Sequence, residues 1–322
     1  MIRISVVVPV YQGELTLLSL LGELAAYSES ALSPRGQNFR VAEVILVNDG
    51  AIDDSTRIMH ELAEQYSFLT LIWLSRNFGQ HPATLAGMAA STGDWVVTLD
   101  EDGQYDPADI GSMLDLAFDR NAQLVYAMPT NLAPHAAWRN LTSRLVKVAS
   151  RMLVGKDLSG GFYSFRLVRG EIARSLAAYC GQGVYLDVAL SWVVGRQAFC
   201  PVVFRPEQGR RSGYSLQRLL SHFWRLVLSA GTRPLRIIAV VGVASILLAL
   251  GLSAHAVWAK IAYQVPIQGW TSLFTAVCLF SGLILFALGV IAEYLALTLT
   301  MAMGRPLYLT VRPPSRSRDN VS

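Results

Sequence analysis

The stretch Trp95-Val-Val-Thr-Leu-Asp-Glu-Asp-Gly-Gln-Tyr-Asp-Pro107, WVVTLDEDGQYDP, runs a short apolar segment directly into three consecutive carboxylates. In extended backbone, alternate side chains share a side, so Asp100 and Asp102 should lie together while Glu101 points away. Two carboxylates held close together disfavour double ionisation unless a cation lies between them. A hard divalent ion, Mg²⁺ or Mn²⁺, fits that chemistry, with the aspartates and the Gln104 amide as ligands and the other positions open to phosphate oxygens.

Short apolar segments alternate with segments of helical periodicity through the N-terminal part of the chain. Val, Ile and Leu dominate the former, and Asp or Pro opens several of the latter, as is common at a helix N-terminus. This alternation predicts an α/β fold in which helices cover both faces of a mostly parallel sheet. The predicted strands are Ile4–Pro9, Val41–Val47, Thr70–Leu74, Trp95–Leu99 and Gln123–Met128. The predicted helices are Leu15–Tyr27, Asp53–Tyr66, Pro82–Ala90 and Pro107–Asn121.

Polar loops follow the first four predicted strands. Parallel strands present their carboxyl ends at one edge of a sheet, where ligands bind, so these loops should meet there. A solvated acidic turn, in which Asp106 only caps the next helix, is the alternative to a metal site, and the meeting of four polar loops favours the metal. The chain has no Gly-x-Gly-x-x-Gly after a strand and no Gly-Lys-Ser/Thr loop, which argues against a dinucleotide-binding fold and a phosphate-loop NTPase. The loops are Pro9–Glu14, Asn48–Asp54, Ser75–His81 and Asp100–Gln104.

The composition is too apolar for an ordinary soluble protein. Of 322 residues, 52% are hydrophobic and only 16% are charged, and the mean hydropathy is +0.38. The apolar excess lies in Ile237–Ala259 and in Leu273–Leu299, which only Glu293 interrupts. Each segment is long enough to cross a hydrocarbon core of about 30 Å, so two transmembrane helices are predicted. A pair of buried core helices is the alternative.

Basic residues flank the two predicted spans on one side only. The segment that joins the spans carries a single Lys260, whereas several arginines precede the first span and follow the second. This asymmetry predicts that both termini and the N-terminal domain are cytoplasmic. We expect no signal peptide in MIRISVVVPVYQGE, whose apolar run is short. Cys180, Cys200 and Cys278 follow no metal or redox spacing and are assigned no function. The flanking arginines are Arg225, Arg233, Arg236, Arg305, Arg312, Arg316 and Arg318.

A basic segment precedes the first predicted span. Between Arg205 and Arg236, seven arginines accompany one acid, Glu207, and residues 139–156 contribute further basic side chains. Arginine binds phosphate in a forked geometry, so a phosphate ligand is predicted. A solvated basic surface, or general attraction to anionic membrane lipid, is the alternative for any single residue. Tyr214–Gly231 has an apolar face and predicts a helix in the membrane interface, with a helix packed on the cytosolic domain as the alternative. Nucleic acid is not an expected partner beside membrane spans.

Several motifs, taken in their order, resemble the GT-A glycosyltransferases of family 2. Within that family they are similar to the polyprenyl-phosphate glycosyltransferases, which include dolichyl-phosphate mannose synthases and bacterial undecaprenyl-phosphate sugar transferases. The resemblance covers nearly the whole chain. The motifs are VVVPVYQGE (Val6–Glu14), EVILVNDGAIDD (Glu43–Asp54), LSRNFGQHPATLAGMAASTGDWVVTLDEDGQYDP (Leu74–Pro107), FRLVRG (Phe165–Gly170), RRSGYS (Arg210–Ser215), PLR (Pro234–Arg236) and, at the end, AEYLA and RPLY (Ala292–Ala296 and Arg305–Tyr308).

The resemblance implies roles for individual residues. It implies Asp100 and Asp102 as catalytic residues, with Asp102 and Gln104 holding the metal. Asn48 and Ala51 depart from the usual Asp-Asp-Gly-Ser, and Gly13 stands where a glutamate is common. The implied nucleotide-binding residues are Pro9, Tyr11, Glu14, Asn48, Asp49 and Asp100. The residues assigned to the acceptor phosphate are Arg139, Arg144, Arg166, Arg210, Arg211, Ser212 and Tyr214, with Arg205 a further candidate.

The resemblance also implies a domain order. It gives a GT-A catalytic domain over 1–213, a juxtamembrane amphipathic helix over 214–234, a two-helix transmembrane domain over 235–304 and a cytoplasmic tail over 305–322. A homo-oligomer is left open.

The function that follows is inverting transfer of a single sugar from a nucleotide-sugar to a polyprenyl (undecaprenyl or dolichyl) phosphate at the cytoplasmic membrane face. The run RNFGQH (Arg76–His81) is similar to the branch that uses UDP-sugars, with GDP-mannose as the other donor. A processive polysaccharide synthase is the nearest alternative, but its Gln-x-x-Arg-Trp signature and additional spans are not found. A membrane-tethered protein that binds nucleotide-sugar without catalysis is the other alternative.

Overall fold

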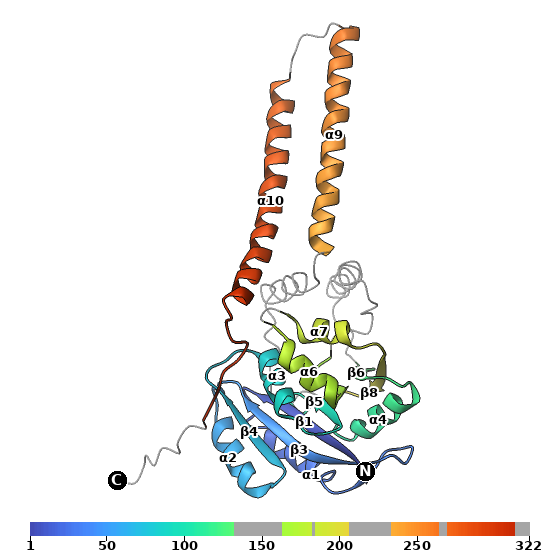
Figure 1. Ribbon diagram of the computed structural model, residues 1–322, viewed down its shortest axis with the longest axis vertical. Helices are drawn as coiled ribbons and strands as arrows, with labels where there is room; N and C mark the ends of the chain where they lie inside the picture. The colour runs from blue at the N-terminus through green and yellow to red at the C-terminus, as the bar shows by residue number, and fades with distance from the viewer. Residues whose placement is uncertain (132–162, 182–183, 206–232, 264–268, 313–322) are drawn as a thin grey trace, which may run out of the picture. The chain divides into compact units, whose positions relative to one another are not determined.

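One mixed sheet forms the core of the first part of the chain (Figure 1). The computed structural model describes residues 1–131, 163–181, 184–205, 233–263 and 269–312. Within these ranges nine strands form the sheet: eight follow the order β8-β6-β7-β5-β1-β3-β4-β9, and the ninth, β2, pairs with β3 beside this path. The strands are β1 (Ile2–Val10), β2 (Ala31–Leu32), β3 (Asn38–Asn48), β4 (Leu69–Leu74), β5 (Trp95–Thr98), β6 (Leu124–Pro129), β7 (Arg166–Arg169), β8 (Gln197–Val202) and β9 (Thr310–Val311).

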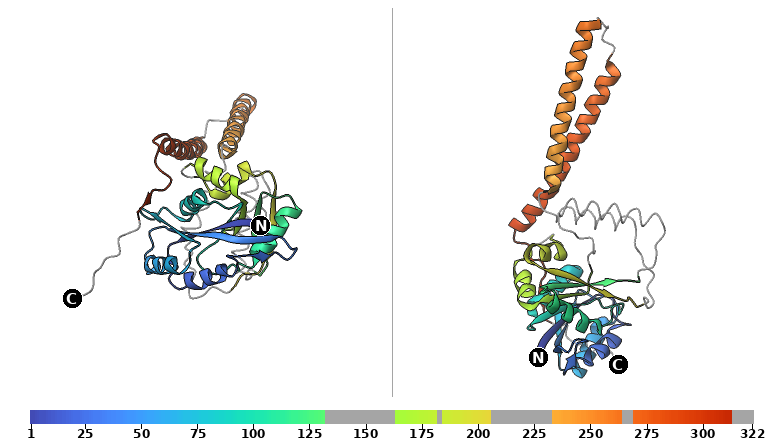
Figure 2. Two further views of the ribbon diagram at one scale, coloured as in Figure 1. Left: turned by 60° about the horizontal axis from the view of Figure 1, so that its bottom comes forward. Right: turned by 90° about the vertical axis from the view of Figure 1, so that its right-hand side faces the viewer.

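Helices cover both faces of this sheet, as the alternating pattern predicts (Figure 2). Side chains of β1 alternate between two cores: Ile4, Val6 and Val8 pack with α1, α2 and α4, whereas Val7 packs with α3, α6 and α7. Each predicted strand and helix of the N-terminal part is present, with boundaries that differ by a few residues. The helices are α1 (Leu17–Ala25), α2 (Ser55–Gln65), α3 (Gln80–Ala90), α4 (Asp109–Asp119), α6 (Gly170–Tyr179), α7 (Leu186–Val193), α9 (Arg233–Tyr263) and α10 (Trp270–Ala302).

The centre of the sheet is parallel, and its flanks are not. β1 lies between β3 and β5 and runs parallel to both, and β4 continues parallel beside β3. β7 lies antiparallel between β5 and β6. Among the described residues four of the eight strand pairings are parallel, so the prediction of a mostly parallel sheet is corrected to a mixed one. The reason is that apolar patterning reports which face of a strand is buried and not the direction of its neighbour.

The chain returns to this sheet after the second long helix. β9 pairs antiparallel with β4, with Trp73 opposite Val311, and the Ser75 N–H donates to the Leu309 carbonyl at 2.9 Å. Leu307 and Tyr308 pack against the core that lies over α3. The described part of the predicted tail from Pro306 onward therefore belongs to the unit that contains the sheet, whereas Arg305 belongs to the second unit.

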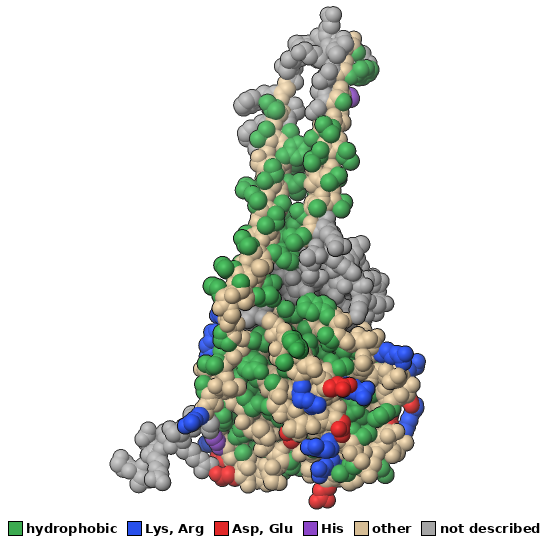
Figure 3. Space-filling view, viewed as in Figure 1, with side chains coloured by type: hydrophobic (Ala, Val, Ile, Leu, Met, Phe, Trp, Pro, Cys, Tyr) green, Lys and Arg blue, Asp and Glu red, His purple; other side chains and the backbone are tan. Residues whose placement is uncertain are grey.

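The two long helices form a second compact unit. α9 has 31 residues and α10 has 33 residues. Hydrophobic side chains cover the described parts of both (Figure 3), and those of α10 between Leu279 and Ala302 are mostly exposed. In the part of the chain that the structure describes, Leu279–Ala302 is the one helical segment long and apolar enough to span a membrane, and Ile238–Gly251 is a shorter apolar segment. Leu279–Ala302 coincides with the predicted span Leu273–Leu299, whereas the other predicted span, Ile237–Ala259, stays a prediction. Most of the predicted interface helix over 214–234 lies outside the described residues.

Candidate active site

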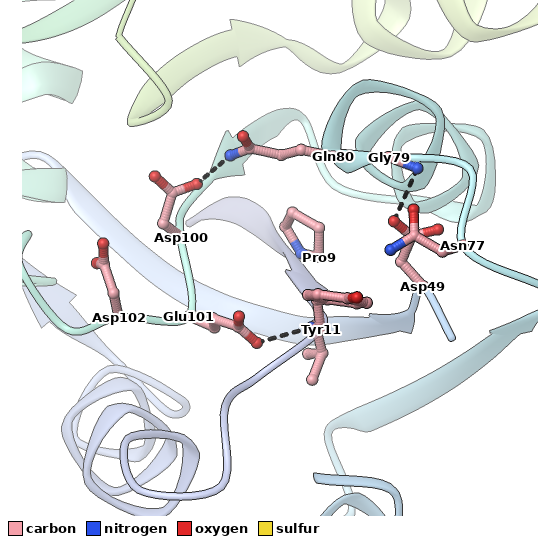
Figure 4. Close-up of a pocket in the computed structure, with 10 residues that line it drawn as sticks. Pro9, Tyr11, Asp49, Asn77, Gly79, Gln80, Asp100, Glu101 and Asp102 are labelled. Atoms are coloured by element: carbon pink, nitrogen blue, oxygen red, sulfur yellow. Dashed lines mark hydrogen bonds between the residues drawn. The ribbon is translucent and has the colours of Figure 1, made fainter. Parts of the chain in front are cut away.

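A pocket of about 370 Å³ opens where β1, β3 and β5 end (Figure 4). Its position agrees with the predicted meeting of strand-end loops, because parallel strands bring their carboxyl ends to one edge. Polar and apolar groups share the lining. The lining residues are Pro9, Val10, Tyr11, Asp49, Asn77, Gly79, Gln80, Asp100, Glu101 and Asp102.

Asp100 is fixed by two donors from different parts of the chain. The Gln80 amide donates to Oδ1 of Asp100, and the Ser164 hydroxyl donates to Oδ2. The pKa of Asp100 is raised to about 6: burial and then the neighbouring Asp102 raise it, against the hydrogen bonds from Ser164 and Gln80 and the charge of Arg166. The site therefore holds one carboxyl whose surroundings favour a cation or a proton beside it.

The loop after β5 departs from the extended geometry that the sequence suggested. β5 ends at Thr98, and the backbone then turns, so all three carboxylate residues line the pocket. The Gln104 N–H donates to Asp102 Oδ1 at 3.1 Å, which closes the turn. The Glu101 carboxylate points toward Tyr11, away from the carboxylates of Asp100 and Asp102, as strand alternation predicted (Figure 4). Gln104, predicted as a metal ligand, is not among the lining residues.

The donors at this pocket suit a cation that retains ligands from its substrate. No group of three or more His, Cys, Asp and Glu side chains that could hold a metal occurs in the described ranges. Asp100 and Asp102 instead offer carboxylate oxygens at the wall of an open pocket. Mg²⁺ characteristically binds through one or two carboxylates plus phosphate oxygens and water, and Mn²⁺ accepts the same oxygen ligands. The residues present fit such an ion.

The loop after β1 supplies the opposite wall. Pro9 and Tyr11 line the pocket, as predicted. The backbone N–H groups of Tyr11 and Gln12 donate to the Glu101 carboxylate, each at 2.9 Å. Glu14, predicted to bind nucleotide, is exposed and does not line the pocket; its N–H donates to Asp53 at 3.2 Å.

The turn after β3 uses its two polar residues differently. Asn48 is buried, and its side-chain oxygen accepts the N–H groups of Gly50 and Ala51, each at 3.0 Å. Asn48 therefore shapes the turn and does not line the pocket, although it was predicted to bind nucleotide. Asp49 does line the pocket. Burial raises the pKa of its carboxyl, and hydrogen bonds from the backbone of Phe78 and Gly79 oppose that rise.

The loop after β4 and the first residue of α3 contribute three lining residues that the sequence did not assign: Asn77, Gly79 and Gln80. Asp49 binds this loop, because its carboxylate accepts the Phe78 N–H at 2.7 Å and the Gly79 N–H at 2.9 Å. Gly50, at φ +69°, lies against the same loop: a Cβ there would come within 2.8 Å of the Asn77 nitrogen. The sequence does contain a signal for these three residues, because RNFGQH is a polar run that follows a predicted strand.

Arg166 does not reach the pocket. It was predicted to bind the acceptor phosphate, but it is 5% exposed and forms a bidentate ion pair with Asp187, at 2.6 and 2.9 Å. Its remaining terminal nitrogen donates to Thr98 Oγ1 and to the Ser164 carbonyl. The predicted role of Arg166 in binding the acceptor phosphate is therefore wrong. Its guanidinium is paired with Asp187 in the interior, where it supports the segment that holds Asp100.

Arg205 is also paired within the catalytic unit. One guanidinium nitrogen donates to both Glu23 oxygens and another lies 2.7 Å from Asp106. This pairing accounts for Arg205 without a phosphate ligand. The other residues predicted to bind the acceptor lie outside the described residues. They are Arg139, Arg144, Arg210, Arg211, Ser212 and Tyr214.

Comparison with known proteins identifies the family. Residues 5–174 match the family model for glycosyl transferase family 2. An undecaprenyl-phosphate 4-deoxy-4-formamido-L-arabinose transferase of Pseudomonas aeruginosa (strain LESB58) is 31% identical over 96% of this chain and 89% of its own. A relative of the same name from Klebsiella pneumoniae (strain 342) is 27% identical, over 96% of this chain and 93% of its own. A similar solved structure is that of glucosyl-3-phosphoglycerate synthase from Mycobacterium tuberculosis in complex with Mn²⁺ and UDP-glucose. It is 20% identical in sequence, the match covers 72% of this chain and 79% of the synthase chain, and the TM-score is 0.49. On the family model and the first relative, this chain belongs to glycosyl transferase family 2, which confirms the resemblance inferred from its motifs.

Proposed function

We propose that this protein transfers one sugar from a nucleotide-sugar to a polyprenyl phosphate at the cytoplasmic face of a membrane, with inversion at the anomeric carbon. The observation that carries the proposal is the similarity to relatives named undecaprenyl-phosphate 4-deoxy-4-formamido-L-arabinose transferase, which extends over 96% of the chain. That extent takes in both the pocket and the apolar helices. A phosphorylated polyprenol is therefore the acceptor class best supported.

The nucleotide-sugar is proposed to occupy the pocket after β1, β3 and β5. Its volume of about 370 Å³ lies within the usual range for small-molecule sites, about 300 to 1,000 Å³. The Pro9 and Tyr11 side suits a flat base, and the side with Asp100 and Asp102 suits a diphosphate held through a cation. A UDP-sugar is the favoured donor, because the run RNFGQH that resembles the UDP-sugar branch contributes Asn77, Gly79 and Gln80 to the lining. GDP-mannose is the alternative.

Asp100 and Asp102 are the residues proposed to hold Mg²⁺ or Mn²⁺, which when bound neutralises the charge that develops on the departing diphosphate. Gln80 and Ser164 orient the Asp100 carboxylate through a hydrogen bond to each oxygen. Because those donors come from α3 and from the residues before β7, the carboxylate is set before the donor arrives. Such preorganisation spares the cost of reorienting a charged group during reaction.

The acceptor requires no general base from the chain. The second pKa of a phosphate monoester is about 6, so its oxygen is already ionised at pH 7 and can attack the anomeric carbon directly. The histidine at the start of α3, His81, does not line the pocket, and its ring packs on Tyr185 with centroids 4.3 Å apart. Binding of that phosphate is proposed for Arg139, Arg144, Arg210 and Arg211, with Ser212 and Tyr214 beside them.

A panel of UDP-sugars and GDP-sugars, offered to the full-length protein in lipid nanodiscs with undecaprenyl phosphate and Mn²⁺, tests the proposal. The expected product is a lipid phosphate that carries one sugar in the inverted configuration. Polymer growth on the lipid would favour the processive alternative, and nucleotide-sugar binding without turnover would favour the non-catalytic one. Equal transfer to a soluble acceptor would remove the lipid phosphate from the proposal.

A further inference from the structure

Glu101 stands between the two pocket aspartates but serves a different loop. Its side chain is 8% exposed. Oε2 accepts the Tyr11 N–H and Oε1 accepts the Gln12 N–H, each at 2.9 Å. In Figure 4 its carboxylate points toward Tyr11, while those of Asp100 and Asp102 point away from it. The main-chain carbonyl of Glu101 also accepts the Thr16 hydroxyl. The residue thus joins the loop after β5 to the loop after β1 through both its side chain and its backbone.

Gly13 leaves the space that this carboxylate uses. A Cβ at position 13 would lie 2.9 Å from Glu101 Oε2 and 2.8 Å from Leu17 Cγ, so any larger residue would displace one of them. The Gly13 N–H is bound separately, by the Ser55 hydroxyl at 2.8 Å. The Glu101 side chain therefore accepts the backbone N–H groups of Tyr11 and Gln12, and the Ser55 hydroxyl accepts the N–H of the residue that follows them.

We infer that Glu101 is a positioning residue for the nucleotide, which acts by fixing Tyr11 against the loop that carries Asp100 and Asp102. The inference rests on the proposed function, since it takes the ligand of this pocket to be a nucleotide diphosphate. It assigns Glu101 no contact with the cation. Charge-assisted hydrogen bonds from two adjacent backbone amides make the link strong, and a neutral amide in its place turns a donor toward one of those N–H groups.

The test uses Glu101→Gln in the full-length protein. Calorimetry measures the affinity for UDP and for GDP in EDTA, and a second titration measures Mn²⁺ binding without nucleotide. We expect nucleotide affinity in EDTA to fall about 10-fold, the cost of losing a charge-assisted hydrogen bond at a buried site. Mn²⁺ affinity should equal that of the parent. The matched control is Glu43→Gln, which removes a carboxylate that accepts the Thr92 N–H at 2.6 Å in a part of β3 that does not line the pocket.

A second variant protects the test against misfolding of the first. Gly13→Ala keeps Glu101 intact but places a methyl group where the carboxylate lies, and it should weaken nucleotide binding in the same way. Gly22→Ala is its control, since a Cβ at position 22 in α1 meets nothing within 4 Å. A loss of Mn²⁺ affinity with unchanged nucleotide affinity would make Glu101 a metal ligand and overturn the inference. Unchanged nucleotide binding in Glu101→Gln and Gly13→Ala would also overturn it, whereas a parent that binds neither nucleotide even with Mn²⁺ present would overturn the proposed function as well.

Discussion

The two aspartates that follow β5 are held differently, and this separates their tasks. Both oxygens of Asp100 accept side-chain hydrogen bonds, from Gln80 and Ser164, whereas Asp102 Oδ1 accepts a backbone N–H within its own turn. Asp100 is therefore oriented by the surrounding fold, while Asp102 is oriented by a local turn at the pocket wall. Substitution at Asp102 should disturb metal binding with little effect on folding.

We predict that Asp102→Asn lowers the transfer rate by about 100-fold or more, because even outer partners of a bound metal change affinity or activity by about 10- to 100-fold. Excess chelator should have the same effect on the parent. The rate of sugar transfer with and without EDTA measures both. Asp119→Asn is the control, since Asp119 lies in an exposed ion pair with Arg35. Full activity in excess chelator would show that the metal assignment is wrong.

We predict that Arg166→Met lowers the free energy of unfolding by about 3 to 5 kcal/mol, because it leaves the Asp187 carboxylate buried without its partner. The side chains of this pair are 6% and 1% exposed. Urea unfolding measures the loss, and adding Asp187→Leu to Arg166→Met should recover part of it. If the single variant unfolds like the parent but needs more polyprenyl phosphate for half-maximal rate, the acceptor role inferred from the sequence is right.

The predicted site residues that do line the pocket are those whose place depends only on position after a strand. Tyr11, Asp49 and Asp102 each follow an apolar run, and a strand end fixes the edge at which they lie. Asn48 and Glu14 were predicted to bind nucleotide and do not line the pocket, because what they bind depends on how the backbone turns after the strand. That turn is set by contacts between loops distant in sequence, which no local pattern reports.

At the scale of elements, β9 is a two-residue strand that completes an edge of the catalytic sheet. We predict that ending the chain after Arg305 lowers the stability of the catalytic unit by about 2 to 3 kcal/mol, since the partly buried Leu307 and Tyr308 leave the core with it. Ending the chain after Arg312 keeps β9 and is the matched control. Thermal unfolding of the two shortened proteins in detergent distinguishes them, and equal midpoints would show that β9 adds nothing.

The strands most accessible to prediction were the central ones. β1 and β3 bury long runs of Val, Ile and Leu on both faces, so the sequence alone indicates them. β7 has only four residues, of which the first and the last are arginines, and β9 has two residues beyond an apolar helix, so neither carries a pattern of its own. Their places depend on partners far away in the sequence, and this is why the mixed character of the sheet was missed.

At the scale of the whole molecule, the flanking arginines lead to a prediction of topology. Reporters that are active only in the cytoplasm, fused before Met1 or after Ser322, should both be active, because short basic flanks stay on the cytoplasmic side. The control is a reporter inserted between Gln37 and Asn38, at the exposed start of β3. An insertion in the middle of β3 would break the sheet. An active far-side reporter at Ser322 would contradict the orientation.

The pairing of β9 with β4 constrains the number of times the chain can cross a bilayer. Hydrogen-bonded strands of one sheet cannot lie on opposite sides of a membrane, so the path from β4 to β9 must make an even number of crossings. If Leu279–Ala302 is one crossing, the path needs another, and α9 is the other long apolar helix on that path within the described ranges. Deleting either helix alone would set β9 across the bilayer from its partner, so the two helices should be gained or lost in evolution only as a pair.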